Sequence, residues 1–276
     1  NTNFTHGTHV GGIAGAVTDN NLGVASIGFN IAIMPVKCTF NAQSSPTSIP
    51  MGYEGMTYAA NAGADIINCS WSSSLFSLTA QDVVNYAISK GCIVVAAASN
   101  DGVEQIRYPA AYNGVIAVAS TDDSDNKSGF SNYGTWVDVS APGSAIRSTI
   151  AQGNGYTGFS GTSMATPMVA GLLGLMKSHN PNLSNAKLEQ CLIDSADNIY
   201  SINPSYIGKM GSGRINAKKS LQCVDQTLVA KPKAQIQSTQ SLTCPGMQVQ
   251  FQGSSTQGKA DTYKWYFTGG NPYTST

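Results

Sequence analysis

The sequence predicts an α/β fold in which a mostly parallel sheet has helices on both faces, followed by an incomplete β-sandwich module. Three continuous apolar runs, at residues 64–70, 92–98 and 114–119, alternate with segments of helical character. Strands that are apolar throughout are typical of parallel sheets buried on both faces. Ligands of such sheets bind beyond the carboxyl ends of the strands, where Ser70 and Asn100 lie.

Taken in chain order, the other elements follow from local pattern. A Gly- and Ala-spaced segment predicts a closely packed helix that begins near His6, and IAIMPVKC at residues 31–38 predicts a buried strand. Further helices are expected at residues 49–62, 79–90, 164–176 and 183–195, with a last short helix that ends near Cys223.

The 276 residues suffice for one large domain and part of a second. We expect a first domain at residues 1–225, a linker at 226–234 that contains Lys-Pro-Lys, and a partial β domain at 235–276 with alternating strands near 247–251 and 263–267. Because the sequence has neither an initiator Met nor a signal peptide and stops within a strand pattern, we expect a fragment truncated at both ends.

Charge and composition exclude several classes of function. The 15 basic and 15 acidic residues balance, which argues against nucleic acid or an anionic membrane as partner. No apolar run reaches the roughly 20 residues that span a bilayer. The charged fraction of 11%, with many small residues, favours an exported protein.

The six cysteines lack CxxC spacing, which argues against zinc or a redox dithiol. Cys191 and Cys223 flank the last helical region and are the preferred disulfide, although other pairings stay open. The default for Cys38, Cys69 and Cys92 is a buried free thiol, because all three lie in or beside apolar runs.

Ser163 lies where a glycine-rich turn gives way to the helix at residues 164–176. Unpaired backbone N–H groups and the positive end of the helix dipole stabilise a nucleophile there and the oxyanion that its attack creates. The alternative is a serine that only caps the helix. His6 can supply the base that decides between the two, because its pKa lies near neutrality.

Three further polar groups have a functional and a structural interpretation. His9 lies on the same helical face as His6, but no third ligand completes a metal site, so we interpret His9 as structural. The loop at residues 18–24 offers oxygen atoms to calcium, yet an Asn- and Gly-rich turn is the preferred interpretation. Asn100 can turn the chain or donate its amide to an oxyanion, and beside His6 and Ser163 we favour the donor.

Several stretches occur in the order that subtilisin-like serine proteases carry them: HGTHVGGIAGA, INCSWS, AAASNDG, YPAAYNGVIAVAS, FSNYG, VDVSAPG and GTSMATPMVAG. Residues 1–221 thus resemble this family. The resemblance implies a subtilisin-like three-layer fold and peptide-bond hydrolysis through an acyl-enzyme. It implies His6 as general base, Ser163 as nucleophile and Asn100 as oxyanion donor. The implied substrate-binding residues are Ser70, Trp71, Ser72, Ala97, Ala98 and Ser99.

The chain departs from the family pattern at two places. Ser72 and Ser99 stand where relatives usually have glycine, which leaves the substrate preference open, as does the stretch 104–108 near the implied pocket base. The family orders its triad Asp, His, Ser, but only five residues precede His6, so we expect the Asp upstream and the fragment itself to be impaired. Asp19 and Asp101 do not match the missing position.

The C-terminal stretch resembles the first half of a PKD domain, an immunoglobulin-like module often attached to secreted bacterial enzymes. Together the resemblances imply a secreted bacterial enzyme, with cell-surface attachment as an option, that acts as a monomer on protein or peptide substrates. The chemistry requires no cofactor; structural calcium stays an option without support from the sequence. The alternatives are a non-catalytic binding relative and an α/β-hydrolase esterase, which the GTSMA context and the His-before-Ser order disfavour.

Overall fold

The computed structural model describes residues 5–40, 48–151, 153, 155–227, 234–238, 251–255, 263–264 and 274–275. The chain divides into two compact units, Asn1–Asp225 and Gln226–Thr276. Within the described ranges, no helix is both long enough and apolar enough to cross a membrane.

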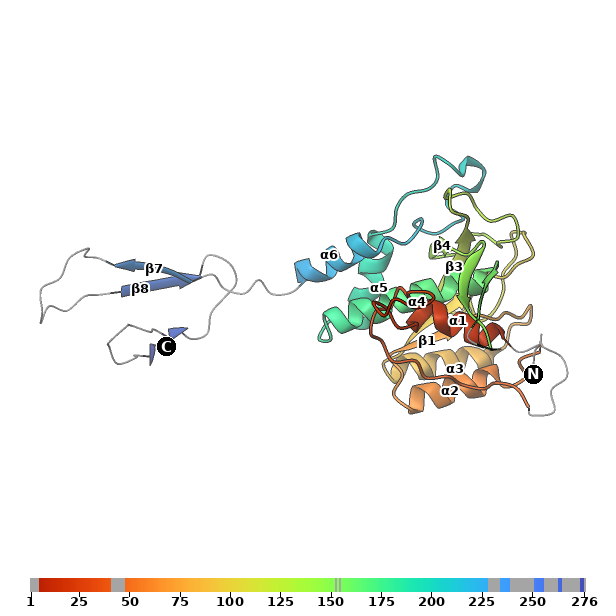
Figure 1. Ribbon diagram of the computed structural model, residues 1–276, viewed down its shortest axis with the longest axis horizontal. Coiled ribbons are helices and arrows are strands. Elements are labelled where there is room, and N and C mark those ends of the chain that lie inside the picture. The colour runs from red at the N-terminus through yellow and green to blue at the C-terminus, as the bar shows by residue number, and fades with distance from the viewer. Residues whose placement is uncertain are drawn as a thin grey trace, which may run out of the picture. The chain divides into compact units, whose positions relative to one another are not determined.

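Four parallel strands form the central sheet of the first unit, in the order β1 (Ile66–Cys69), β2 (Ile93–Ala97), β3 (Val115–Thr121) and β4 (Val139–Pro142) (Figure 1). Spatial order follows chain order because each crossover returns beside the strand that it left. In register, Cys69 lies opposite Ala96, and Ala97 lies opposite Val118. The three predicted strands at residues 64–70, 92–98 and 114–119 are therefore present.

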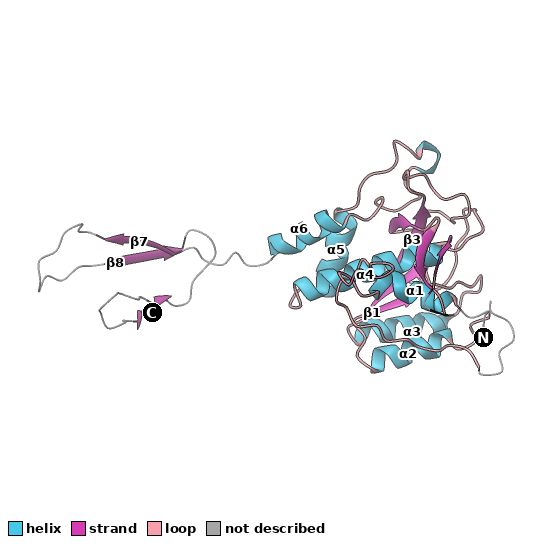
Figure 2. Ribbon diagram, viewed as in Figure 1, coloured by secondary structure: helices cyan, strands magenta, loops and turns pink. Residues whose placement is uncertain are grey.

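Helices cover both faces of this sheet (Figure 2). The helices α2 (Gly52–Asn61) and α3 (Leu78–Ser89) pack on one face, while α4 (Thr162–His179) and α5 (Asn185–Asp194) pack on the other. The remaining helices are α1 (His6–Gly15), the 3₁₀ turn η1 (Pro204–Tyr206) and α6 (Ala217–Thr227). The predicted layered α/β arrangement is confirmed.

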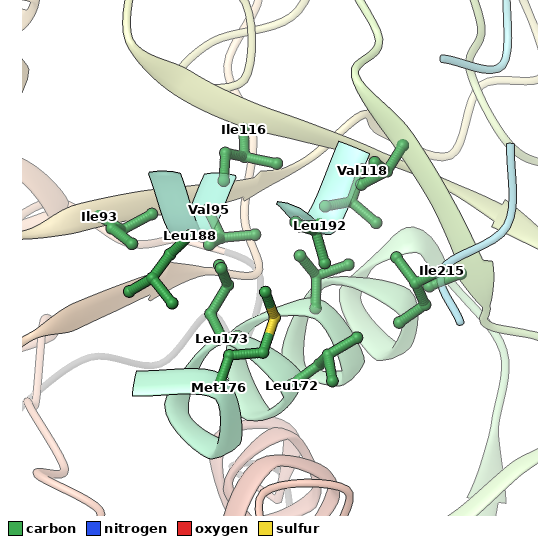
Figure 3. Packing of buried hydrophobic residues seen from close by; sticks show 14 of the residues in the cluster. Ile93, Val95, Ile116, Val118, Leu172, Leu173, Met176, Leu188, Leu192 and Ile215 are labelled. Atoms are coloured by element: carbon green, nitrogen blue, oxygen red, sulfur yellow. The ribbon is translucent and has the colours of Figure 1, made fainter. Parts of the chain in front are cut away.

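Alternating strand residues explain why the sheet strands are apolar throughout. Ile93 and Val95 point toward α4 and α5, where Figure 3 shows them above Leu173 and Met176. Val94 and Ala96, which alternate with them along β2, belong to the cluster formed with α2 and α3. Burial of each large aliphatic side chain contributes about 1.5–3 kcal/mol relative to exposure, so both faces stabilise the sheet.

The predicted strand at residues 31–38 is wrong. This segment forms no strand, and Ile33 and Met34 are exposed. Instead of joining the sheet it passes over α2: the carbonyl of Cys38 accepts a hydrogen bond from Met51 N (3.2 Å), and a Cβ on Gly55 would meet the Cys38 sulfur. Among the described residues β1 is left as an edge of the sheet.

A hairpin that the sequence did not predict follows β4 in the chain and precedes α4. Its antiparallel strands are β5 (Ile146–Thr149) and β6 (Tyr156–Phe159). Ser148 Oγ donates to the carbonyl of His9 (2.8 Å) and Thr149 Oγ1 donates to that of Thr8 (2.9 Å). The hairpin therefore holds the first turns of α1.

Cys191 on α5 and Cys223 on α6 form the predicted disulfide. The free thiols of Cys69 and Cys92 are buried, as expected, whereas Cys38 is only half-buried. Burial raises the pKa of the Cys69 thiol to about 12, which keeps it in the unreactive protonated form. Cys244 lies outside the described residues.

In the second unit the described strands are β7 (Ala234–Ser238), β8 (Phe251–Ser255), β9 (Tyr263–Lys264) and β10 (Thr274–Ser275). The strand pairs β7–β8 and β9–β10 are antiparallel. Most of the predicted linker and the predicted strand at 247–251, except Phe251, lie outside the described residues, as does the end of the strand expected at 263–267.

Candidate active site

The side chain of Ser163 is fixed at the start of α4. Ser163 is the second residue of that helix and is 8% exposed. Its Oγ donates a hydrogen bond to the carbonyl of Ser70 (3.1 Å), and Ser70 Oγ donates in return to the Ser163 carbonyl (2.9 Å). Pro167 makes this exchange possible: four residues on, it has no N–H to bond the Ser163 carbonyl, which stays free for Ser70.

The side-chain amide of Asn100 is oriented by the residue before Ser163. Asn100 Oδ1 accepts hydrogen bonds from Thr162 N (2.8 Å) and from Thr162 Oγ1 (2.9 Å). Its Nδ2 and the backbone N–H of Ser163 have no acceptor among the described residues. A Cβ built on Gly161 would lie 3.4 Å from Asn100 Nδ2 and 3.6 Å from Ser163 N. Two unpaired donors thus border one small space, as an oxyanion hole requires.

His6 is the first residue of α1, and close backbone packing places this helix. A Cβ on Gly171 would lie 3.0 Å from the carbonyl of Ala14, so α1 and α4 approach closely only because Gly171 lacks a side chain. His6 is exposed to solvent. Desolvation lowers the pKa of His6 and the neighbouring His9 ring lowers it further, which favours the neutral, basic form.

Between described residues, no hydrogen bond joins His6 to Ser163 or to a carboxylate. Catalytic hydrogen bonds are often long without substrate and tighten when it binds, so this geometry keeps His6 as a candidate base.

His9 is buried completely. Its Nε2 lies 3.0 Å from the carbonyl of Thr157, and its ring stacks on Phe159 with centroids 4.4 Å apart. Burial lowers the pKa of His9 below its ordinary value. In the described part of the chain, no three His, Cys, Asp or Glu side chains gather into a potential metal site. The structure gives His9 the structural role that we predicted.

The two segments predicted to contact substrate differ in what they can offer. The side chains of Ala97 and Ala98 are buried in the core, so these residues can meet a substrate only through their main chain. Trp71 packs edge-on against Tyr53 on α2, with ring centroids 5.1 Å apart. Ser72 and Ser99 turn their hydroxyls toward each other, with a 3.1 Å hydrogen bond.

The loop at residues 18–24 is a turn in which Asp19, Asn21 and Gly23 have positive φ. Asn20 Oδ1 accepts a hydrogen bond from Leu22 N (3.0 Å), which is the usual use of an Asn side chain in a turn.

Sequence reasoning missed two contributions to the site. Thr162 orients Asn100, and its place directly before Ser163 in GTSMATP was the available signal. Arg107 Nη2 pairs with Asp101 Oδ2 (3.1 Å), next to Asn100 in sequence. The sequence pattern did not predict this ion pair, because both partners lie in an irregular loop.

Comparison with known proteins supports the same interpretation. The profile of the subtilase family matches residues 1–238. Thermitase of Thermoactinomyces vulgaris is 45% identical over 217 residues, which cover 79% of this chain and 75% of thermitase. A thermophilic serine proteinase of a Bacillus species is 45% identical over 212 residues, which cover 77% of this chain but only 51% of that proteinase.

Solved structures agree with the sequence relatives. A protease from Pseudoalteromonas arctica superposes with a TM-score of 0.70 at 30% identity, over 79% of this chain and 70% of that one. Fervidolysin from Fervidobacterium pennivorans, a keratinolytic enzyme related to subtilisin, superposes with a TM-score of 0.70 at 27% identity, over 80% of this chain and 36% of that one. The chain belongs to the subtilase family, the subtilisin-like serine endopeptidases.

Proposed function

We propose that this chain hydrolyses peptide bonds through an acyl-enzyme in which Ser163 is the nucleophile, His6 the general base and Asn100 an oxyanion donor. One observation carries the proposal: a buried serine hydroxyl at the start of α4 lies beside two unpaired N–H groups that border a common space. Such fixed donors stabilise the charge that develops during acyl transfer.

In the first half-reaction, His6 accepts the proton of Ser163 Oγ as that oxygen bonds the substrate carbonyl carbon. The carbonyl oxygen becomes an oxyanion, which accepts hydrogen bonds from Asn100 Nδ2 and Ser163 N. When the C–N bond breaks, His6 returns the proton to the leaving amine. In the second half-reaction, His6 takes a proton from water, the hydroxide displaces Ser163 from the acyl group, and the serine regains its proton.

A carboxylate that accepts a hydrogen bond from the second ring nitrogen of His6 completes this mechanism, since it orients the imidazole and stabilises its charged form. No carboxylate among the described residues does so. The proposal assigns this role to an aspartate outside the printed sequence, as the family order implies.

We assign main-chain recognition of the substrate to the segments 70–72 and 97–99, which flank Ser163 and Asn100. The proposed substrates are proteins or peptides, cleaved by a monomer without a cofactor in the chemical steps. The disulfide between Cys191 and Cys223 supports an extracellular site of action, because such bonds persist in oxidising compartments.

Active-site labelling tests this proposal. The full-length protein would be treated with a fluorophosphonate, and the modified peptide would be mapped. We expect modification at Ser163 alone. Ser163→Ala should abolish labelling and lower turnover by about 10⁶-fold, the size of the effect in subtilisin. The melting temperature should fall by only a few degrees, because a single hydrogen bond to Ser70 is lost. Ser178→Ala, an exposed serine of the same helix, is the matched control and should behave as the parent. An active Ser163→Ala protein, or a folded parent that resists labelling, would overturn the assignment.

A further inference from the structure

Ser72 and Ser99 lie opposite each other, just beyond the carboxyl ends of the strands β1 and β2 and near Ser163. The register of these strands pairs Cys69 with Ala96, so an equal step of three residues brings Ser72 opposite Ser99. Their hydroxyl groups complete the contact: Ser72 Oγ donates to Ser99 Oγ at 3.1 Å. The two chain segments are thus joined across the space between them.

The position of this bridge relative to Ser163 tells which part of a substrate meets it. Ser70 O lies 3.1 Å from Ser163 Oγ, and Asn100, directly after Ser99, offers Nδ2 at the proposed oxyanion space. In the proposed binding mode, the segments 70–72 and 97–99 recognise the main chain of the substrate on the acyl side of the cleaved bond. The side chain of the residue before that bond would then enter between Ser72 and Ser99.

The bridge is anchored by a charged pair. Ser99 Oγ donates to Asp101 Oδ2 (3.0 Å), and the same oxygen accepts from Arg107 Nη2 (3.1 Å) and from Asn132 Nδ2 (3.3 Å). A carboxylate with several donors and a guanidinium partner keeps its position, and hydrogen bonds to ionised groups are stronger than neutral ones. Ser99 is therefore held in place by more than its contact with Ser72.

The backbone of Ser99 points to a functional use of this hydroxyl. Its φ is +90°, in the region that glycine adopts freely and other residues rarely adopt. Non-glycine residues in such conformations gather at functional sites, where the surrounding structure compensates the strain. Here the compensation comes from the two hydrogen bonds of the Ser99 hydroxyl.

We propose that the Ser72–Ser99 bridge determines specificity: it closes the space between the two segments and restricts the residue on the acyl side of the cleaved bond to glycine, alanine or serine. A large side chain would have to part the two hydroxyls and disturb the anchor at Asp101. This inference rests on the proposed endopeptidase function and names the substrate class of that site.

The test compares two peptides that differ only in the residue before the cleaved bond, alanine or phenylalanine, hydrolysed by the full-length protein. The parent should show a kcat/KM for the alanine peptide at least about tenfold above that for phenylalanine. In the double variant Ser72→Gly with Ser99→Gly, this ratio should fall by about 10- to 100-fold, because kcat/KM for the phenylalanine peptide rises.

Two further variants separate specificity from structure. Ser74→Gly makes the same exchange in an exposed neighbour that takes no part in the bridge, and should keep the parental ratio. Ser99→Gly alone removes the strained φ together with the two hydrogen bonds that compensate it, so its melting temperature should stay within a few degrees of the parent while the ratio falls. Peptide aldehydes with the two side chains give a second readout, their inhibition constants, that does not depend on turnover.

The outcomes distinguish this inference from the function on which it rests. Two outcomes would overturn only the proposed role of the bridge in specificity. One is hydrolysis that needs Ser163 but prefers the phenylalanine peptide in the parent; the other is a kcat/KM ratio that the double glycine variant leaves unchanged. Hydrolysis that survives Ser163→Ala, or neither hydrolysis nor labelling of the folded protein, overturns the proposed function and the bridge with it.

Discussion

The beginnings of α4 and α1 carry the two groups proposed to exchange a proton, but the structure holds them in different ways. At the start of α4, Ser163, Thr162 and Asn100 make hydrogen bonds to one another or to Ser70. At the start of α1, the described residues offer the His6 ring no such bond, although the backbone after it is tied to β5.

This difference separates two kinds of preorganisation. The proposed nucleophile and oxyanion donors are fixed by polar contacts from the ends of neighbouring strands, so their geometry is part of the folded sheet. The proposed base is placed through the backbone of α1, by the close packing of Gly171 against Ala14 and by the hydrogen bonds from β5. Changes near Ser163 should therefore affect geometry, whereas changes at His6 should affect chemistry alone.

Replacement of His6 by alanine gives the largest expected effect. Turnover should fall by about 10⁶-fold, as it does when the equivalent group is removed from subtilisin, because no other base is at hand. Since the ring makes no hydrogen bond among the described residues, thermal unfolding should occur at the parental temperature. Peptide hydrolysis and calorimetry measure the two quantities.

The matched control is His179→Ala. His179 is an exposed histidine near the end of α4 that pairs with Asp225, so its loss should leave turnover unchanged. If His6→Ala unfolded at a lower temperature than the parent, the ring would have a structural role. The contrast drawn between the starts of α1 and α4 would then be wrong.

Asn100→Ala should lower kcat by about 10²- to 10³-fold with little change in KM, because a donor that acts on the developing oxyanion is removed. The measurement is steady-state kinetics on a peptide substrate. Equal loss in kcat and kcat/KM is the signature of an interaction made only in the transition state.

Thr162 sharpens this prediction. Thr162→Val keeps the shape but loses the hydroxyl that donates to Asn100 Oδ1, while the backbone N–H bond remains. We expect kcat of Thr162→Val to fall roughly tenfold, which places it between the parent and Asn100→Ala. In Thr162→Ser, which keeps the hydroxyl, kcat should be close to that of the parent. A Thr162→Val enzyme as slow as Asn100→Ala would mean that the hydroxyl, not the N–H, fixes the amide.

The smallest effect concerns pH. Because desolvation lowers the pKa of His6, the ring stays neutral at pH values where an ordinary histidine is half protonated. Without the proposed carboxylate partner, kcat/KM should therefore increase with pH through a midpoint below about 6.5, the usual pKa of histidine; the partner stabilises the charged ring and so raises that midpoint. A pH profile of kcat/KM checks this, and a midpoint above 6.5 would show that a charged partner of His6 outweighs desolvation.

The sequence predicted the elements whose pattern is local. The strands β1 to β3 are short apolar runs, and their burial on both faces makes each run continuous. The segment 31–38 has the same pattern but lies across α2, because a strand needs a partner and an apolar run alone does not specify one. β5 and β6 escaped prediction because their sequences, IRST and YTGF, show neither an apolar run nor the alternation of apolar and polar residues that predicts a strand.

The candidate site divides along the same line. Ser163, Asn100 and His6 could be named because each follows a glycine-rich turn, ends a strand or begins a helix. The hydrogen bonds from Thr162 to Asn100 Oδ1 join residues 62 positions apart, which spacing in the sequence does not encode. The pairing of Asp101 with Arg107 depends on how an irregular loop folds.

The disulfide between Cys191 and Cys223 has a consequence for the unfolded chain. It closes a loop with a sequence separation of 32 residues between α5 and α6. In the chain-entropy description, this closure lowers the conformational entropy of the unfolded chain. The effect stabilises the folded state by about 3.7 kcal/mol at 25 °C. That amount is a large part of the 5–15 kcal/mol by which domains are typically stable. The oxidation state of one cysteine pair thus decides how much of this stability the enzyme keeps where it works.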